Sequence, residues 1–394
     1  MSDDGISTFN PLLGGGVIDT RIGLGAHRAA GAPLTPIGVP GVTYVSRHAH
    51  VREVLLDHTH LSSEGNFMLA DADDEPTPAL ITQSDPPRHT MLRDLLRPAF
   101  RRASMINAAP WVQGNVDALL DALPDSGPAD IVADIALPLT SSVITRLIGV
   151  PQQDAARLAE LSFALGAMVP RNFFQTDEWD ELEAYFVARA MKRRTAPDKP
   201  DDVLTRLVIA SVDGEPLPDR EIAFHAWQLF VAGIESTAYT IGWTVHHLLA
   251  SRDRWEALLA DRSLLPLARE EGLRHCTAIR WVMRLAKDGA EVGGVAVPPG
   301  QRLLVGLESA NLDEAEFGTN AAEFDMFRGS ARRHVAFGHG AHLCLGAELS
   351  RIEITTVLSR LLDRMPGLRL ADPTVWHDDP SPIFCGLRRV DVVW

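Results

Sequence analysis

The chain has 394 residues, of which 46% are hydrophobic and 23% are charged, a composition typical of a folded protein and not of a disordered one. Its 37 Lys and Arg residues against 52 Asp and Glu residues give a net charge of −15. Such an acidic chain is a poor partner for nucleic acid or for an anionic membrane. The three cysteines, Cys276, Cys344 and Cys385, are too few for a disulfide framework and favour a reducing, cytoplasmic location.

Neither the N-terminus nor the longest apolar run of the chain has the features of a targeting or membrane segment. Residues 1–16 contain Asp3 and Asp4 and lack the basic and apolar regions of a signal peptide. The longest apolar run, residues 222–234, is interrupted by His225 and Gln228 and is too short to span a bilayer. The sequence therefore predicts no membrane segment.

The first two thirds of the chain change from turn-rich to helical sequence. The first hundred residues are rich in Gly and Pro, with short strand-like pieces such as residues 42–45. Apolar residues at three- and four-residue spacing predict helices within residues 112–123 and 154–165. Asp219 is a predicted N-cap for a helix of about thirty residues that runs to Ala250, and its apolar residues surround the axis, as in a helix buried on all sides.

The last third mixes strands and one further helix. Residues 282–307 read as short strands separated by Gly and Pro turns, and residues 345–365 as a helix. Alternating residues in 383–394 predict a C-terminal hairpin. The sequence therefore predicts a mainly α protein with small β-sheets, for which length alone would allow two or three domains.

The most informative segment is residues 337–346, where glycines surround Cys344 immediately before the predicted helix. A helix N-terminus stabilises a thiolate through its dipole and free N–H groups, and glycines allow close approach of the backbone. A lone thiolate of this kind binds haem iron and favours O–O cleavage. The usual alternative for a lone cysteine, a small buried hydrophobe, fits the glycines less well, and no second cysteine lies near for a zinc site.

This segment resembles the haem-binding loop of the cytochrome P-450 family, Phe-x-x-Gly-x-x-x-Cys-x-Gly, with Phe337, Gly340, Cys344 and Gly346 in register. The resemblance extends from about residue 85 to the end of the chain. It implies a b-type haem whose iron is bound by Cys344 and which lies between the long central helix and the helix after the cysteine. It also implies a triangular helical prism formed by a single domain, residues 1–394.

The resemblance further implies which side chains bind the two haem propionates. His89 and Arg93 match a His-x-x-x-Arg segment of the family, and they lie one helical turn apart. Arg284 and His342 match two further propionate contacts. Charge-assisted hydrogen bonds from Arg suit such carboxylates. The alternative for His89 and Arg93 is an ordinary solvated helix face.

A second set of charged residues is expected to be structural. Glu271 and Arg274 match the family's Glu-x-x-Arg pattern and can pair along one helix. The resemblance adds Arg328 as the third member of a buried charged network that supports folding and haem loading rather than catalysis.

Residues 232–237, Ala-Gly-Ile-Glu-Ser-Thr, place an acid and two hydroxyls in the middle of the apolar helix, which is costly unless they are used. The resemblance makes Glu235 the acid and Ser236 the alcohol of a pair that delivers protons during oxygen activation. The family usually has Thr in place of Ser236, so Thr237 is a third catalytic candidate. The alternative is that the hydroxyls bond back to the preceding helical turn.

The resemblance alone places the walls of a substrate pocket: Ala232, Ile279, Val282, Phe384, residues 67–70 and residues 163–174. Most of these residues are apolar, which suits a hydrophobic small molecule, although each is equally compatible with ordinary core. The family often has Pro where this chain has Ala278, a departure that concerns the local backbone near the pocket.

Together these features predict a haem-thiolate monooxygenase that inserts one oxygen atom from O₂ into a small hydrophobic substrate, in the context of secondary metabolism. The sequence has no ferredoxin-type cysteine cluster, so electrons are expected from a separate ferredoxin and ferredoxin reductase. Arg97, Arg101, Arg102 and residues 332–333 are predicted to face that acidic partner. Two alternatives stay open: peroxide-driven or non-oxygenating haem-thiolate chemistry, and a haem-binding sensor or carrier without turnover.

Overall fold

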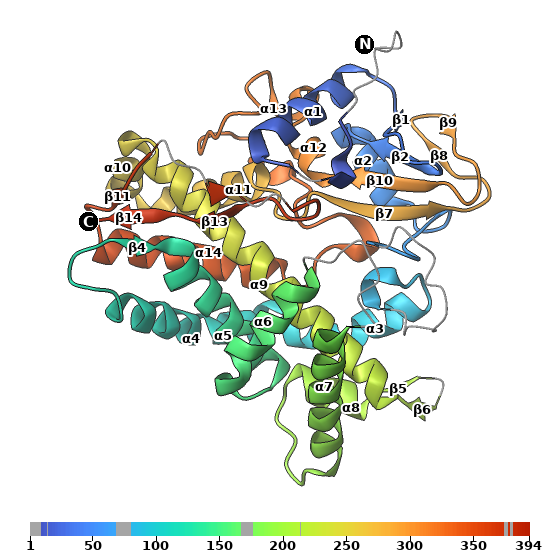
Figure 1. Cartoon of the computed structure of the whole chain (residues 1–394), viewed down its shortest axis with the longest axis horizontal. Coiled ribbons are helices and arrows are strands. Elements are labelled where there is room, and N and C mark those ends of the chain that lie inside the picture. The colour runs from blue at the N-terminus through green and yellow to red at the C-terminus, as the bar shows by residue number, and fades with distance from the viewer. Residues whose placement is uncertain are drawn as a thin grey trace.

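A computed structural model describes residues 9–13, 15–67, 80–166, 176–212, 214–373, 377–378 and 381–394. Helices build most of the molecule, the main sheet lies at the upper right of Figure 1, and a smaller sheet of β4, β11 and β14 lies at the left, near the C-terminus. The α-helices are α1 Val17–Ala29, α2 His48–Leu56, α3 Arg88–Leu96, α4 Arg102–Asp121, α5 Leu137–Ile148, α6 Ala155–Gly166, α7 Asp177–Thr195, α8 Val203–Ile209, α9 Asp219–Leu249, α10 Arg252–Ala260, α11 Leu265–His275, α12 Leu307–Asn311, α13 Glu314–Phe317 and α14 Ala347–Arg364.

The strands are β1 Thr35–Pro36, β2 Val42–Val45, β3 Leu61–Ser62, β4 Ala129–Asp130, β5 Ser211–Val212, β6 Glu215–Pro216, β7 Trp281–Ala286, β8 Glu291–Val292, β9 Val295–Ala296, β10 Arg302–Gly306, β11 Arg369–Leu370, β12 His377–Asp378, β13 Leu387–Arg389 and β14 Asp391–Val393. The mainly α class with small sheets is therefore confirmed. The predicted helices and strands of residues 42–45, 154–165, 282–307 and 345–365 are present at close to their expected bounds. The helix expected within residues 112–123 is also present, as α4, but it begins ten residues earlier, at Arg102.

Helix α9 is the long central helix that the sequence predicts, and it runs between the other helices (Figure 1). Its N-cap is Pro218, so Asp219 is the first helical residue and not the cap. The runs 221–228 and 237–246 are buried without interruption, because α5, α7, α11 and α14 pack around the helix. Burial on every side explains why its apolar residues follow no single stripe.

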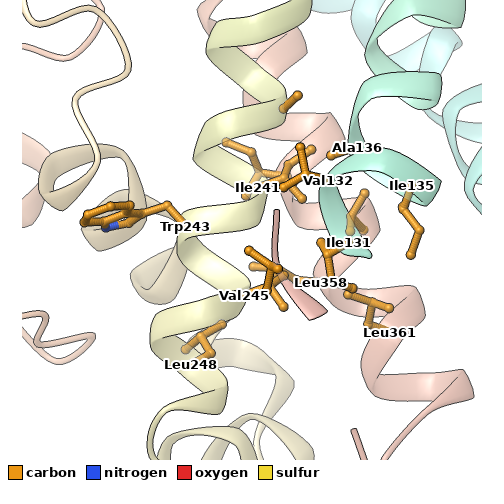
Figure 2. Close-up of a cluster of buried hydrophobic side chains, with 14 of the residues drawn as sticks. Ile131, Val132, Ile135, Ala136, Ile241, Trp243, Val245, Leu248, Leu358 and Leu361 are labelled. Atoms are coloured by element: carbon orange, nitrogen blue, oxygen red, sulfur yellow. The ribbon is translucent and has the colours of Figure 1, made fainter. Parts of the chain in front are cut away.

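The largest apolar cluster holds α9 to its neighbours. Figure 2 shows the π-helical turn Ile131–Ala136 packed against Ile241 and Val245 of α9 and Leu358 and Leu361 of α14. Each fully buried side chain of this size contributes about 1.5–3 kcal/mol. The cluster fixes α9 and α14 relative to each other, and these are the two helices that flank the site described below.

Residues Ile131–Ile148 correct one expectation from the sequence. This window, and not residues 222–234, is the segment of the described chain that is long and apolar enough to cross a membrane by length and composition. In the structure 61% of it is buried against other helices, as is usual for the core helix of a folded domain.

The main sheet has the strand order β1-β2-β10-β7-β3, in which only β2 and β10 run parallel. Arg302 pairs with Val42 on one side and with Leu285 on the other. Side chains two residues apart on a strand share a face. Val282 and Arg284 of β7 therefore project together, toward the cavity described below.

The predicted C-terminal hairpin is wrong. Strands β13 and β14 are separated by Val390 alone, which is shorter than the two-residue turn that a hairpin needs. Strand β13 pairs with β12, and β14 pairs with β11 and β4. The alternating pattern of residues 383–394 therefore corresponds to two strands that belong to different sheets.

Candidate active site

A cavity of about 400 Å³ lies between α9, the loop that carries Cys344, and strand β7. Its lining comes from residues as far apart in the chain as Leu55 and Phe384, and most of it is apolar. The four residues predicted to line a pocket all do so: Ala232, Ile279, Val282 and Phe384. Phe67 lines it as well, residues 163–166 do not, and residues 68–70 and 167–174 lie outside the described residues.

The Cys344 loop is a series of tight turns held by its own backbone. Cys344 N–H donates to the Phe337 carbonyl at 2.9 Å, and Leu343 N–H donates to the Gly340 carbonyl at 3.1 Å. Gly340 has φ +70°, and a Cβ there would lie 2.5 Å from the Leu55 carbonyl oxygen. Only glycine tolerates both conditions, which accounts for the residue at this position of the motif.

Helix α14 begins at Ala347, three residues after Cys344, so the thiol lies at a helix N-terminus as the sequence predicts. The thiol is free and faces the cavity, whereas Cys276 and Cys385 are buried. Desolvation by the surrounding protein raises the pKa of the Cys344 thiol even though the side chain faces the cavity, and the N–H groups of Gly346 and Ala347 oppose this. A bound metal ion reverses that balance, because a coordinating thiol is deprotonated outright.

The four predicted propionate ligands meet on one side of the cavity, and all four line it: His89, Arg93, Arg284 and His342. The rings of His89 and His342 lie 4.0 Å apart. Ser63 Oγ lies 2.9 Å from His342 Nε2, and Arg93 donates to the Leu343 carbonyl at 2.6 Å. Residues from α3, β7 and the Cys344 loop are thereby brought together.

This cluster is short of negative charge. Arg284 is 4% exposed, yet among the described residues neither Arg284 nor Arg93 forms an ion pair with a carboxylate, and His89 Nε2 is buried without a partner. The nearest acid, Asp85, already pairs with Lys287 at 2.7 Å. An anionic group with two carboxylates beside a cysteine thiol would satisfy these donors, and haem b is such a group.

The pKa values in the cluster show the same imbalance. Burial, followed by the charges of Arg284 and His89, lowers the pKa of His342 to about 3. Burial and Arg93 lower the pKa of His89, and burial lowers the pKa of Arg284 to about 10. Each shift is caused mainly by burial of the cationic form, which the charge of Asp85 only partly offsets.

Across the cavity, the hydroxyls of α9 are placed in two different ways. Ser236 Oγ donates to the Ala232 carbonyl at 2.7 Å, the back-bond that was the alternative interpretation. Thr237 Oγ1 instead donates to Ser350 Oγ of α14 at 3.1 Å. Ser236 and Thr237 line the cavity, whereas Glu235 is buried and is not among its lining residues.

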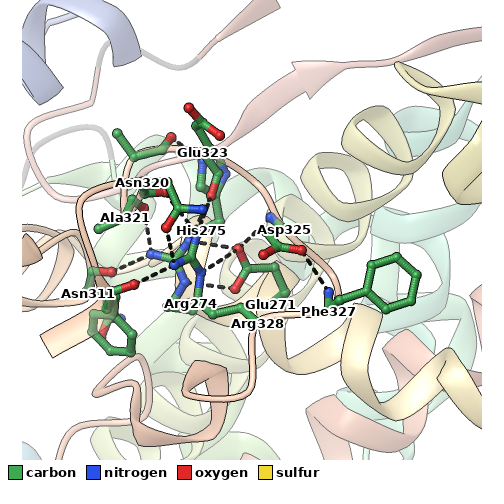
Figure 3. A network of polar contacts seen from close by, with 12 residues as sticks. Glu271, Arg274, His275, Asn311, Asn320, Ala321, Glu323, Asp325, Phe327 and Arg328 are labelled. Atoms are coloured by element: carbon green, nitrogen blue, oxygen red, sulfur yellow. Dashed lines mark hydrogen bonds and ion pairs between the residues drawn. The ribbon is translucent and has the colours of Figure 1, made fainter.

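The predicted charged network is assembled around Glu271, as Figure 3 shows. Arg274 binds both carboxylate oxygens of Glu271, at 2.8 and 2.7 Å, and neither side chain is exposed to solvent. Arg328 lies 3.4 Å from the same carboxylate. The remaining guanidinium N–H groups donate to backbone carbonyls: Asn311, Ala321 and Glu323 for Arg274, and Phe317, Asn320 and Glu323 for Arg328.

Several polar residues of the cavity wall escaped sequence reasoning. Ser350 and Glu353 reach the cavity from α14, and Glu353 is 2% exposed with a pKa raised well above its usual value by burial. Asn66 and Thr82 reach it from the loops before α3. In the sequence Gln228 is visible only as a polar interruption of an apolar run, and that interruption is the one feature that could have indicated a polar site on the cavity wall.

The chain is similar to known proteins over most of its length. The family model described as Cytochrome P450 matches residues 37–365. Nocardicin C N-oxygenase of Nocardia uniformis is 37% identical over 340 residues, which cover 84% of this chain and 83% of the relative. Steroid C26-monooxygenase of Mycobacterium tuberculosis is 32% identical over 326 residues, which cover 82% of this chain and 87% of the relative.

Solved structures match over almost the entire chain. CYP108D1 from Novosphingobium aromaticivorans superposes with a TM-score of 0.87 at 27% identity, covering 98% of this chain and 97% of that one. The LnmA cytochrome P450 hydroxylase of Streptomyces atroolivaceus superposes with a TM-score of 0.76 at 34% identity, covering 89% and 90%.

Proposed function

Because this chain belongs to the cytochrome P450 family, we propose that the cavity beside Cys344 is where it oxidises a largely apolar small molecule. The chain is a haem-thiolate monooxygenase with haem b as its cofactor. When bound, the haem activates O₂ so that one oxygen atom enters the substrate and the other leaves as water. The observation that supports this use of the cavity is that the Cys344 thiol and the apolar wall of α9 line the same cavity.

We propose that residues 1–394 act as one domain and that Cys344 is the axial iron ligand. Cavity-lining residues from Leu55 to Phe384 must come together to form a single site, which supports one domain. His89, Arg93, Arg284 and His342 would bind the propionates. His89 Nε2 has no hydrogen-bond partner among the described residues, and neither Arg93 nor Arg284 is paired with a carboxylate there.

For proton delivery, Glu235, Ser236 and Thr237 are the proposed groups. Ser236 keeps its oxygen lone pairs free while it donates to Ala232, and Thr237 is linked to Ser350. In Glu235→Gln and Ser236→Ala variants, product formed per NADH consumed should fall, because proton supply limits productive turnover. Thr244→Val is the matched control, since among the described residues the Thr244 hydroxyl bonds only to the Thr240 carbonyl, and Thr244 does not line the cavity. Unchanged yield in both variants would refute the relay.

Family membership supports electron supply by separate redox partners. We propose a ferredoxin and its reductase as electron donors, docked near Arg101 and Arg332, which are exposed and form no ion pair within the described residues. Arg97 is bound to Asp94 at 3.1 Å and Arg333 to Glu316 at 2.8 Å, so they offer less free charge. The side chain of Arg102 lies outside the described residues.

We propose the cytoplasm as the location, since the three free thiols suit a reducing compartment and the chain's net charge disfavours anionic membranes. The test of the proposed function is reconstitution of the holoenzyme with ferredoxin, reductase, NADH and O₂ against a panel of apolar compounds. NADH-dependent product supports a monooxygenase. Product with hydrogen peroxide alone, and none with NADH, would overturn O₂-driven turnover.

A further inference from the structure

One part of the cavity wall is polar where its surroundings are apolar. Gln228 of α9 is 8% exposed, lines the cavity and lies between Trp227 and Leu229, which line it as well. Its amide nitrogen Nε2 donates to Thr82 Oγ1 at 2.5 Å. Its amide oxygen Oε1 is buried and has no hydrogen-bond partner among the described residues. An unpaired buried amide oxygen is destabilising, so this arrangement calls for an explanation.

The Thr82 side of this pair is held in place by the main sheet. Asn66 accepts a hydrogen bond from Met283 N–H of β7 at 2.8 Å and donates to the Thr82 carbonyl at 3.3 Å. Gln83 donates to the Asn66 carbonyl at 3.0 Å. The 3₁₀ turn Ile81–Gln83 is thus tied to β7, and Thr82 presents its hydroxyl to Gln228 from a fixed position.

The pair leaves one acceptor and one donor unused. Gln228 Oε1 accepts nothing, and within the described chain the Thr82 hydroxyl accepts the Gln228 bond without donating one. If the amide oxygen and nitrogen of Gln228 exchange places, Gln228 has the unused donor and Thr82 the unused acceptor. The pair therefore still has one of each. A hydroxyl group, which donates once and accepts, is complementary to it.

The pair lies at a defined distance along α9 from the proposed reaction site. Gln228, Ala232 and Ser236 are spaced four residues apart and line the same cavity. At 1.5 Å per residue, Gln228 is about 6 Å from Ala232 and about 12 Å from Ser236 along the helix axis.

We propose that Gln228 and Thr82 form an anchor that hydrogen-bonds a hydroxyl group of an otherwise apolar substrate and thereby sets which carbon reaches the Cys344 end of the cavity. This inference rests on the proposed function, because it assigns the substrate class of that same site. It predicts that the oxidised carbon lies about 6–12 Å from the anchored hydroxyl.

The test uses N-alkylimidazoles of increasing chain length, each made in two forms that end in a methyl or in a hydroxyl group of the same size. The imidazole nitrogen binds haem iron and fixes one end, so the Soret shift of the holoenzyme reports binding of each probe without turnover. At the chain length that reaches the anchor, the hydroxyl probe should bind about tenfold more tightly than the methyl probe.

Gln228→Leu and Thr82→Val should each abolish this preference or reverse it in favour of the methyl probe. Thr240→Val is the control, because Thr240 lines the same cavity but its hydroxyl already donates to the Ser236 carbonyl at 2.8 Å. It should keep the preference. Two variants are used so that poor folding of one, visible in its carbon monoxide spectrum, does not decide the result.

Three outcomes overturn the inference. A preference that is absent at every chain length in the natural protein, or one that survives in both anchor variants, contradicts the anchor while the proposed function stands. Failure of every probe to shift the Soret band would contradict the proposed function itself, and the anchor with it.

Discussion

Two arginine clusters of this protein, one buried and one partly buried, differ in how completely their charges are paired. In the network of Glu271, Arg274 and Arg328, the carboxylate binds both arginines and the remaining guanidinium N–H groups reach backbone carbonyls (Figure 3). Beside the cavity, Arg93 and Arg284 have no carboxylate partner in the described chain. Both clusters are built from the same residue type, so burial alone does not separate them.

The difference indicates what each cluster is for. A buried charge is stable only when it is paired and hydrogen-bonded, so a complete network supports the fold by itself. An incomplete one retains desolvated donors at a cost, which a ligand that binds them would offset. We therefore propose that the first cluster is a scaffold and that the second is a binding site for an anionic group.

Breaking the complete network should have the largest effect on stability. Arg274→Met leaves the Glu271 carboxylate buried beside Arg328 with one partner fewer, and should lower the free energy of unfolding by about 3–5 kcal/mol. Urea denaturation followed by circular dichroism measures this. Arg262→Met is the control, because its pair with Asp363 is partly exposed, and it should cost less than about 1 kcal/mol. Equal losses in the two variants would mean that the network is not a scaffold.

Removing a charge from the incomplete cluster should act on haem and not on folding. Arg284→Met should change the stability of the haem-free protein by less than about 1 kcal/mol, since no ion pair is broken. Haem should dissociate roughly ten- to a hundredfold faster, the equivalent of one charge-assisted hydrogen bond. Transfer of haem to an apo-globin measures the rate.

Arg360→Met serves as the control, because Arg360 of α14 is paired with Asp117 at 2.6 Å and does not line the cavity. It should leave haem retention unchanged. An Arg284→Met protein that unfolds as readily as Arg274→Met and keeps its haem would remove the distinction between the clusters.

Buried His246 should make the stability of the folded protein depend on pH. Burial lowers the pKa of His246 on α9 from 6.5 to about 4. The unfolded chain therefore binds a proton at His246 more readily than the folded protein does. The stability of the folded protein is unaffected by this histidine above about pH 6.5 and falls as the pH is lowered toward 4. Between pH 7 and 5 the loss is about 2 kcal/mol. Comparison of natural protein with His246→Gln by denaturation at both pH values should show a smaller loss in the variant, and an equal loss would assign acid sensitivity elsewhere.

The exposed arginines Arg101 and Arg332 belong to neither cluster, and changing them should have the smallest effect of the variants considered. Reversing Arg101 and Arg332 to Glu should slow reduction by ferredoxin a few-fold at low salt, because complementary surface charge mainly raises the association rate. Stopped-flow reduction at several salt concentrations measures it. Rates that do not change at any salt concentration would place the docking surface elsewhere.

The sequence allowed the scaffold and the cysteine site to be predicted because their residues lie in short local patterns. The spacing of Glu271 and Arg274 on one helix, and the glycines around Cys344, carry their geometry with them. The C-terminal hairpin failed because alternation identifies strands and not their partners. Residues such as Gln228 and Thr82 meet only through tertiary packing across 146 positions, and no local pattern reports that contact.

The central claim is that Cys344 supplies the thiolate for a haem held by the incomplete cluster. The most direct measurement is the absorption spectrum of the dithionite-reduced protein with and without carbon monoxide, compared with that of Cys344→His. The natural protein should show the strongly red-shifted Soret band of a thiolate–iron–carbon monoxide complex, and the variant should lose it while keeping haem. A shorter-wavelength band in the natural protein, or no haem signal in a folded and haem-supplemented sample, would contradict the claim.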